Sequence, residues 1–328
     1  MKDKHSLAVD IGGTKMAICA LDKNGIVAGD IESIPIPFND KHVADLEIIL
    51  EIIHKKYHEL KKKAIKIPGI GISICGSVDP MGENVIYVPN LYWRNIPLRK
   101  LVSEKIGIPV FVDQDTRAAA LGEAVWGIAK GIDSFYWVTV GTGVGSAMFL
   151  NGSLFTGVHG YSGWLGHSTV DEINGPVCSC GRRGCLETYV SGPWITKKAE
   201  EIIRQGRGQG ILENTSGNPV MAADVFEAAR EGDSAAVEIA ESVVHLLAKS
   251  IGTVVNILDI QLVILGGGVI KHSPVIADLV LESIPPFIAG KEILEDLQIK
   301  PESLPNSALF GAGAMVFRCL NENGIKGT

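Results

Sequence analysis

The 328-residue sequence has no excess of positive charge. Its 30 Lys and Arg residues are outnumbered by 37 Asp and Glu, which gives a formal net charge of −7 with neutral histidines. A protein that binds nucleic acid or an anionic membrane needs a basic face to displace counterions. The composition therefore argues against both kinds of partner.

Long apolar runs are lacking as well. No uninterrupted apolar stretch approaches the roughly 18 residues that a spanning helix needs. The start, MKDKHSLAVD, has no apolar core of a signal peptide. We therefore expect a cytoplasmic protein. With 46% hydrophobic and 20% charged residues the chain is typical of globular proteins, and its length favours two domains on a prior of about 150 residues each.

Cysteine is scarce, with six in the chain, but three of them lie close together. In a reducing compartment a cluster such as Cys178, Cys180 and Cys185 indicates a metal site before a disulfide framework. With His167 the three thiolates would fill a tetrahedral zinc shell, which leaves no open position for catalysis. We therefore predict a structural zinc site. The isolated cysteines, interpreted as small buried apolar side chains, are Cys19, Cys75 and Cys319.

The two best-known nucleotide signatures are absent. The chain has no G-x-x-x-x-G-K-[ST] and no G-x-G-x-x-G at its first strand-to-helix turn. Three glycine-rich turns follow predicted strands instead, and glycine lets backbone N–H groups approach phosphate oxygens. Each turn alone is also what an ordinary hairpin requires, but together they suggest a grip on one nucleotide. The predicted cofactor-binding residues are Gly12, Gly13, Thr14, Lys15, Gly141, Thr142, Gly143, Gly266, Gly267 and Gly268.

One pattern occurs twice along the chain. The order strand, glycine turn, strand, Asn-Gly is found at residues 7–25 and again at 135–152, and Asn-Gly between apolar runs is a strong hairpin signal. The repetition indicates two similar α/β halves. Apolar spacings of three and four predict a helix from about 41 to 63, and a second covers 235–251. Residues 206–219, rich in Gly, Asn and Ser, are expected to form a mobile loop.

Acidic residues stand where predicted strands end. Asp10 ends a buried strand beside the first glycine turn, where it could hold Mg²⁺ through water. Asp113 and Asp115 lie where a strand runs directly into a helix. Side chains at such a junction point out of the sheet into a cleft, so Asp115 is the candidate catalytic base. A helix N-cap is the structural alternative for Asp115.

In their order and spacing these motifs resemble the ROK family (repressors, open reading frames and sugar kinases), and the resemblance covers essentially the whole chain. The segments that carry it are 10–15 (DIGGTK), 89–91 (PNL) with Trp93, 113–123 (DQDTRAAALGE), 141–145 (GTGVG), 157–167 (GVHGYSGWLGH), 178–187 (CSCGRRGCLE) and 265–269 (LGGGV).

The resemblance implies an α/β protein with the actin-like ATPase (ribonuclease H-like) fold, in which two lobes close over ATP, Mg²⁺ and a sugar. We expect the first lobe to comprise residues 1–116 and 305–328. The second would comprise 117–304 and carry the zinc-binding loop. A helix around 308–317 would pack back on the first lobe, and the family favours a homodimer.

The same resemblance implies an ATP-dependent sugar kinase. Asp115 would take the proton from a sugar hydroxyl, with the 6-OH as the expected acceptor, as that hydroxyl attacks the γ-phosphorus. Glu187, just after the zinc cluster, would bind sugar hydroxyls. The predicted sugar contacts are Asn90, Gln114, Asp115, Trp164, His167 and Glu187.

Three positions depart from the family pattern. Gln114 and Arg117 each stand where the family usually has Asn, and Trp164 stands where it usually has a sugar-binding Glu. An indole cannot accept a hydrogen bond from a hydroxyl, so the pocket would discriminate against a sugar that needs the carboxylate. Plain glucose is therefore less favoured as the substrate, and an N-acylhexosamine or another modified sugar or polyol is more favoured. Alternatively, Trp164 turns away and fills core.

Two other functions stay open. One is a sugar-responsive regulator, but the family's regulators carry a DNA-binding domain before the phosphate motif, which here begins at residue 10. The other is a sugar-binding protein with weak or lost kinase activity, which Trp164 suggests. The retention of Asp10, Asp115 and Glu187 favours an active kinase over this second alternative.

Overall fold

The computed structural model describes residues 4–325 and forms two compact α/β units. Within that range the first unit comprises residues up to Asp133, Met148–Ser162 and the chain from Ser303, and the second comprises Ser134–Ala147 and Gly163–Glu302. The first unit therefore includes residues 117–133 and 148–162, which the sequence had assigned to the second lobe. The outermost parts of the predicted first lobe, residues 1–3 and 326–328, lie outside the described range.

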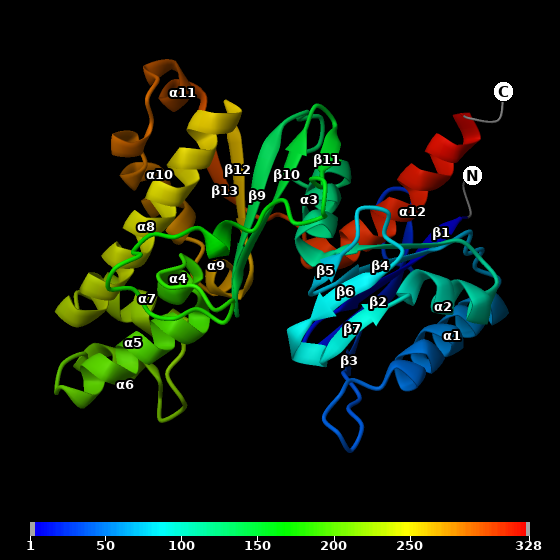
Figure 1. Cartoon of the computed structure of the whole chain (residues 1–328), viewed down its shortest axis with the longest axis horizontal. Coiled ribbons are helices and arrows are strands. Elements are labelled where there is room, and N and C mark those ends of the chain that lie inside the picture. The colour runs from blue at the N-terminus through cyan, green and yellow to red at the C-terminus, as the bar shows by residue number, and fades with distance from the viewer. Residues whose placement is uncertain (1–3, 326–328) are drawn as a thin grey trace. The chain divides into compact units, whose positions relative to one another are not determined.

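The first unit is built on a five-stranded sheet in the order β3-β2-β1-β4-β8 (Figure 1). As the sequence predicted, its N-terminal strands form an antiparallel meander, and β4 and β8 then add in parallel. The bounds are β1 (His5–Ile11), β2 (Lys15–Asp22), β3 (Glu32–Pro35), β4 (Ile70–Ile74) and β8 (Val110–Gln114).

The register of the parallel strands places polar residues side by side. Asp10 on β1 pairs with Ser73 on β4, and Ser73 pairs with Asp113 on β8. The carboxyl ends of parallel strands lie at the same end of the sheet, where α/β proteins bind ligands. Two of the predicted acidic residues therefore lie together at the carboxyl ends of these strands.

Four helices and a small sheet complete the first unit. Helix α1 begins at Leu46 rather than near 41, because Asn39 Oδ1 accepts hydrogen bonds from the backbone of Lys41 and Val43 and holds that stretch as a turn. Asp45 then caps the helix. The bounds are α1 (Leu46–Lys62), α2 (Leu98–Ile106), α3 (Asp115–Val125), α12 (Ser307–Ile325), β5 (Ser77–Val78), β6 (Val85–Val88) and β7 (Trp93–Ile96).

Helix α12 packs against α3 and β4, as Figure 1 shows for the red and teal helices. The approach is so close that it requires glycine. A Cβ added at Gly311 would lie 1.6 Å from the carbonyl oxygen of Ala118, and one added at Gly71 would lie 1.7 Å from that of Ala312. This packing explains why α3 belongs to the first unit, and it agrees with the expected return of the C-terminal helix to this unit.

The second sheet has the order β11-β10-β9-β12-β13. Strand β10 starts in the second unit and ends in the first, which also contains β11. The sequence predicted the strands on both sides of the second glycine turn. The bounds are β9 (Phe135–Val140), β10 (Val144–Leu150), β11 (Ser153–Phe155), β12 (Leu262–Gly266) and β13 (Gln298–Pro301).

In the second unit the predicted helix 235–251 is found within α8 (Ser234–Leu258), and one other prediction needs correction. The stretch 206–219 is not a plain loop, because it contains the short helix α6. Asp233 Oδ2 accepts a hydrogen bond from Gly210 N in this helix, and Ile211 is buried. The bounds are α4 (Glu187–Val190), α5 (Gly192–Arg204), α6 (Gln209–Asn214), α7 (Ala222–Arg230), α8 (Ser234–Leu258), α9 (Gly268–His272), α10 (Ile276–Ser283) and α11 (Lys291–Asp296).

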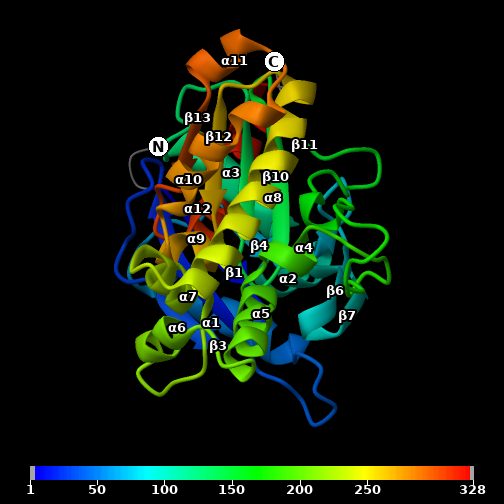
Figure 2. The same ribbon diagram turned by 90° about the vertical axis from the view of Figure 1, so that its left-hand side faces the viewer.

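Helix α8 is the one described helix that is long and apolar enough, by length and composition, to cross a membrane. Our sequence expectation missed it because charged residues interrupt its apolar run. Of its most apolar 18 residues 44% are buried, and the helix contacts α7 and α10 within the second unit (Figure 2). These features are those of a core helix in a globular unit.

Glu123 joins the end of α3 to the start of α12. Its side chain is fully buried, and its Oε1 accepts hydrogen bonds from Ser303 N, Leu304 N and Ser307 Oγ. We expect Glu123→Ala to lower the free energy of unfolding by about 3 kcal/mol or more, because the buried hydroxyl of Ser307 and several partly buried donors lose their acceptor. Urea unfolding measures this change. In the control Glu104→Ala, on the exposed face of α2, the change should stay within about 0.5 kcal/mol, and equal effects would contradict the assigned role.

Candidate functional site

Asp10 lies in the first unit at the end of β1, where three elements meet. Its Oδ1 accepts a hydrogen bond from Ser73 Oγ at 2.8 Å, and its Oδ2 accepts one from Asn306 Nδ2 at 3.3 Å. Burial raises the pKa of this carboxyl, against the opposing effects of the two hydrogen bonds and of Lys15. Sequence reasoning missed both partners. A serine within the otherwise apolar strand β4 was the available signal for Ser73.

Asp115 is the first residue of α3, and Gln114 occupies the N-cap position without a side-chain cap bond. Asp115 Oδ1 accepts a hydrogen bond from Thr116 N at 2.8 Å. Burial, followed by the negative charge of Asp10, raises the pKa of Asp115 to about 7, although Thr116 N and Arg117 oppose the shift. The group can therefore gain or lose a proton near neutral pH, as a general base must.

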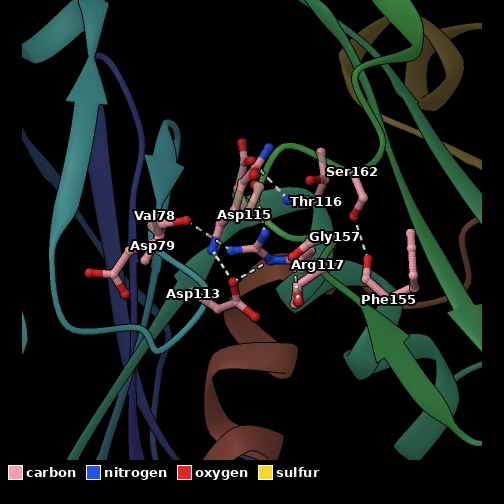
Figure 3. A network of polar contacts seen from close by, with 12 residues as sticks. Val78, Asp79, Asp113, Asp115, Thr116, Arg117, Phe155, Gly157 and Ser162 are labelled. Carbon is pink, nitrogen blue, oxygen red and sulfur yellow. Dashed lines mark hydrogen bonds and ion pairs between the residues drawn. The ribbon is translucent and has the colours of Figure 1, made fainter.

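Arg117 is paired with Asp113 (Figure 3), an interaction that we did not predict. The distance from Arg117 Nε to Asp113 Oδ1 is 2.5 Å, and only 1% of the arginine side chain is exposed. Burial raises the pKa of Asp113, and the guanidinium opposes that rise. The spacing of four residues, which brings side chains together on a helix, was the sequence signal for the pair.

Two buried polar atoms next to Asp115 have no hydrogen-bond partner among the described residues. They are Gln114 Oε1 and Thr116 Oγ1. An unpaired buried polar group is costly and calls for an explanation, such as a ligand that completes it. The strand-to-helix junction therefore offers an acceptor and a hydroxyl beside the candidate base.

The first glycine turn joins β1 to β2, with Thr14 and Lys15 exposed. Gly12 N donates a hydrogen bond to Lys15 O at 3.0 Å, which closes the turn. A Cβ at Gly13 would lie 2.9 Å from Cβ of Asn90, so the exposed side chain of Asn90 packs directly on the turn. The predicted phosphate-side turn and one predicted sugar contact are thus neighbours in the first unit.

The other two glycine turns adjoin each other in the second unit. Strands β9 and β12 are parallel neighbours and lead into Gly141 and Gly266 respectively. A Cβ at Gly141 would lie 3.4 Å from Gly268 N. Gly267 has a φ of +90°, and a Cβ there would lie 2.4 Å from Thr139 Oγ1. Side chains pack on both turns, since a Cβ at Gly143 would lie 2.7 Å from Glu187 Oε2 and one at Gly266 would lie 2.7 Å from Trp137 Cζ2.

His167, Cys178, Cys180 and Cys185 also come together in the second unit, with all four potential ligand atoms within 4.8 Å of one another. His167 Nδ1 lies 3.6 Å from Cys178 Sγ, and Cys180 Sγ lies 3.6 Å from Cys185 Sγ. These sulfurs are too far apart for a disulfide, whose bond is about 2.05 Å long. Zinc bonds of about 2.3 Å to sulfur place tetrahedral ligands about 3.8 Å apart, so the donor set and spacing fit zinc.

Glu187 connects this cluster to the second glycine turn. Its Oε2 accepts a hydrogen bond from Val144 N at 2.9 Å, and its Oε1 lies 3.9 Å from Cys178 Sγ. Trp164 stands against the imidazole of His167 with ring centroids 5.4 Å apart, and 42% of the tryptophan is exposed. The indole therefore does not fill core, which removes the structural alternative raised by the sequence.

The predicted site residues form one group in each unit. The first unit contains Asp10, Gly12, Gly13, Thr14, Lys15, Asn90, Gln114 and Asp115. The second contains Gly141, Thr142, Gly143, Trp164, His167, Cys178, Cys180, Cys185, Glu187, Gly266, Gly267 and Gly268.

Comparison with known proteins places the chain in a family. A sequence model of the ROK family matches residues 6–318. The glucokinase of Halalkalibacterium halodurans is 29% identical, with 96% of each chain covered. The xylose repressor of Bacillus spizizenii is 27% identical over 94% of this chain and 75% of the repressor.

Solved structures agree with the sequence match. The ROK family glucokinase from Streptomyces griseus, solved in complex with glucose and AMPPNP, superposes with a TM-score of 0.80 at 27% identity, covering 96% of this chain and 99% of that one. The fold is that of the actin-like ATPases, as expected. The chain is a member of the ROK family.

Proposed function

We propose that the protein is an ATP-dependent sugar kinase that transfers the γ-phosphoryl group to a sugar hydroxyl, with the 6-OH as acceptor. The observation that carries this proposal is the desolvated Asp115, whose pKa of about 7 suits it to accept a hydroxyl proton. The similarity to a glucokinase at 29% identity supports it. Most of the rate acceleration would come from positioning and charge neutralisation, as in other phosphoryl transfers.

The residues around Asp115 suit a polyhydroxylated acceptor. The unpaired Gln114 Oε1 can accept a hydrogen bond from a hydroxyl, and the exposed amide of Asn90 can donate or accept one. Asp115 would hold the attacking hydroxyl and remove its proton as the bond to phosphorus forms. The proton would remain on the carboxyl until product leaves.

ATP and Mg²⁺ are the expected co-substrate and ion. The glycines of the three turns carry no side chain of their own, which would let phosphate oxygens and the adenosine approach the backbone closely. Asp10, held by Ser73 and Asn306, would bind hydrated Mg²⁺, whose charge neutralises the phosphates.

In the second unit we propose that zinc, bound by His167 and the three cysteines, holds the segment that carries Glu187. The Oε1 of Glu187 lies near Cys178 Sγ, so this loop positions the carboxylate. Trp164 would offer an apolar wall to the sugar, which favours an N-acylhexosamine or another modified sugar or polyol over plain glucose. We also propose a cytoplasmic homodimer.

The main alternative is a sugar-binding regulator or a kinase with weak or lost activity. The xylose repressor that matches over 94% of this chain and the presence of Trp164 favour it. This alternative predicts sugar binding without release of ADP.

The first test is phosphoryl transfer. ADP release with a panel of hexoses, N-acetylhexosamines, ketoses and polyols should show turnover with at least one member. Asp115→Asn should reduce kcat by about 10²- to 10⁴-fold, because the general base is lost. The control Asp40→Asn, at an exposed aspartate, should match wild type. Sugar binding without turnover would support the alternative, and equal rates in Asp115→Asn and wild type would refute the base assignment.

The pH dependence of kcat/KM should reflect Asp115. A protonated carboxyl cannot accept the hydroxyl proton, so the rate should rise with pH and level off above a pKa of about 7. Steady-state rates measured between pH 5 and 9 provide the curve. A rate already maximal at pH 5 would mean that Asp115 is ionised there and that its environment does not raise its pKa.

The metal proposal is tested by composition. Elemental analysis should find about one zinc per chain. Cys185→Ser should lose the metal, unfold at lower temperature and show a higher KM for sugar, because the segment carrying Glu187 is no longer held. Cys19→Ala, at a buried cysteine outside the cluster, should keep its zinc. Metal-free protein with unchanged sugar KM would contradict the proposal.

A further inference from the structure

Arg117 is the largest of the fully buried side chains in the described part of the chain. Its guanidinium contacts three segments of the first unit, two of which, at Asp113 and Val78, are labelled in Figure 3. Besides Asp113, Nη1 donates to Gly160 O at 2.9 Å, and Nη2 lies 3.5 Å from Val78 O. A buried cation is costly unless its donors are paired. Here the planar guanidinium donates hydrogen bonds to one carboxylate and to two carbonyl groups.

The segment formed by residues 156–162 is closed by hydrogen bonds that Ser162 donates to Thr156 O and Phe155 O. It contains no helix or strand, and Val158 and Tyr161 are 87% and 42% exposed. Gly160 has a φ of +76°, and a Cβ there would lie 2.6 Å from Val78 O. The two carbonyl groups bound by Arg117 therefore belong to two segments in direct contact, and the guanidinium joins them to the end of β8.

The location of this segment connects it to the site. Residue 162 is where the chain leaves the first unit for the second, and Trp164 and His167 follow at once. At the other end of the contact, Arg117 lies two residues after Asp115 on α3. The Arg117 side chain thus links the strand-to-helix junction that carries Asp115, the proposed base, to the segment that leads into the proposed sugar contacts.

We propose that Arg117 is a positioning residue that anchors residues 156–162 and so fixes the sugar side of the site, an inference that rests on the proposed function. Arg117 need not touch the sugar for this role. Loosening the anchor should displace the acceptor sugar, while the glycine turns proposed to bind ATP stay in place. The effect should therefore fall on sugar binding and turnover more than on nucleotide binding.

Three variants separate the anchor from general stability. Arg117→Lys keeps the charge but replaces the planar fork by a single ammonium. Gly160→Ala keeps Arg117 and pushes the segment away from Val78. Asp113→Asn combined with Arg117→Met removes both charges, so that no unpaired carboxylate is buried. The control Arg230→Met removes an arginine whose side chain is 69% exposed in its ion pair with Glu227.

The readouts are amide hydrogen exchange of a peptide covering residues 156–162 and the separate KM values for sugar and ATP. Arg117→Lys and Gly160→Ala should each speed exchange in this peptide and lower kcat/KM for sugar by about tenfold or more. The KM for ATP should change less than about twofold, and the two substitutions should not be additive, because both release the same contact. Arg230→Met should behave as wild type.

Unchanged exchange in Arg117→Lys and in the double-charge variant would overturn the inference, as would an equal rise in both KM values. If the double-charge variant does not fold, Arg117→Lys and Gly160→Ala still decide. If wild type turns over no sugar, the proposed function fails together with the sugar-binding part of this inference, and the exchange data alone decide whether Arg117 anchors the segment.

Discussion

Three carboxylates share one desolvated region of the first unit, and its organisation depends on how their charge is offset. The parallel register aligns Asp10 with Ser73 and Asp113, and the turn into α3 adds Asp115. Asp113 is paired with Arg117, whereas Asp10 accepts two hydrogen bonds and burial still raises its pKa. Asp115 responds to both neighbours, since Asp10 raises its pKa and Arg117 lowers it.

This charge arrangement gives each group a separate task. Asp113 and Arg117 form a fixed pair that shapes the backbone around the junction. Asp10, at the carboxyl end of β1 beside the first glycine turn, is suited to bind a hydrated cation. Asp115 is left as the group that can exchange a proton near neutral pH. In the second unit, Glu187 connects the metal-ligand cluster to a glycine turn through Val144 N, so structural and ligand-binding roles are combined there as well.

Much of this could be predicted because it depends on local pattern. The duplicated glycine hairpins, the strand-to-helix junction at Asp115 and the clustering of His167 with the cysteines all follow from spacing along the chain. What escaped prediction depends on distant segments meeting. Ser73 and Asn306 reach Asp10 through sheet register and the return of α12, and the division between units depends on α12 packing against α3. For Arg117, the sequence revealed an unusual residue but not the carbonyl groups of Val78 and Gly160 that it binds.

The central claim is that burial beside a second carboxylate makes Asp115 a base that titrates near neutral pH. The most direct test is carbon-13 NMR titration of aspartate side-chain carboxyls in the protein without added Mg²⁺ or nucleotide, with the Asp115 signal identified by its loss in Asp115→Asn. The account predicts a midpoint near pH 7 that moves to lower pH in Asp10→Asn, because the repulsion between the carboxylates is removed. A midpoint near 4 in wild type, unchanged in Asp10→Asn, would contradict it.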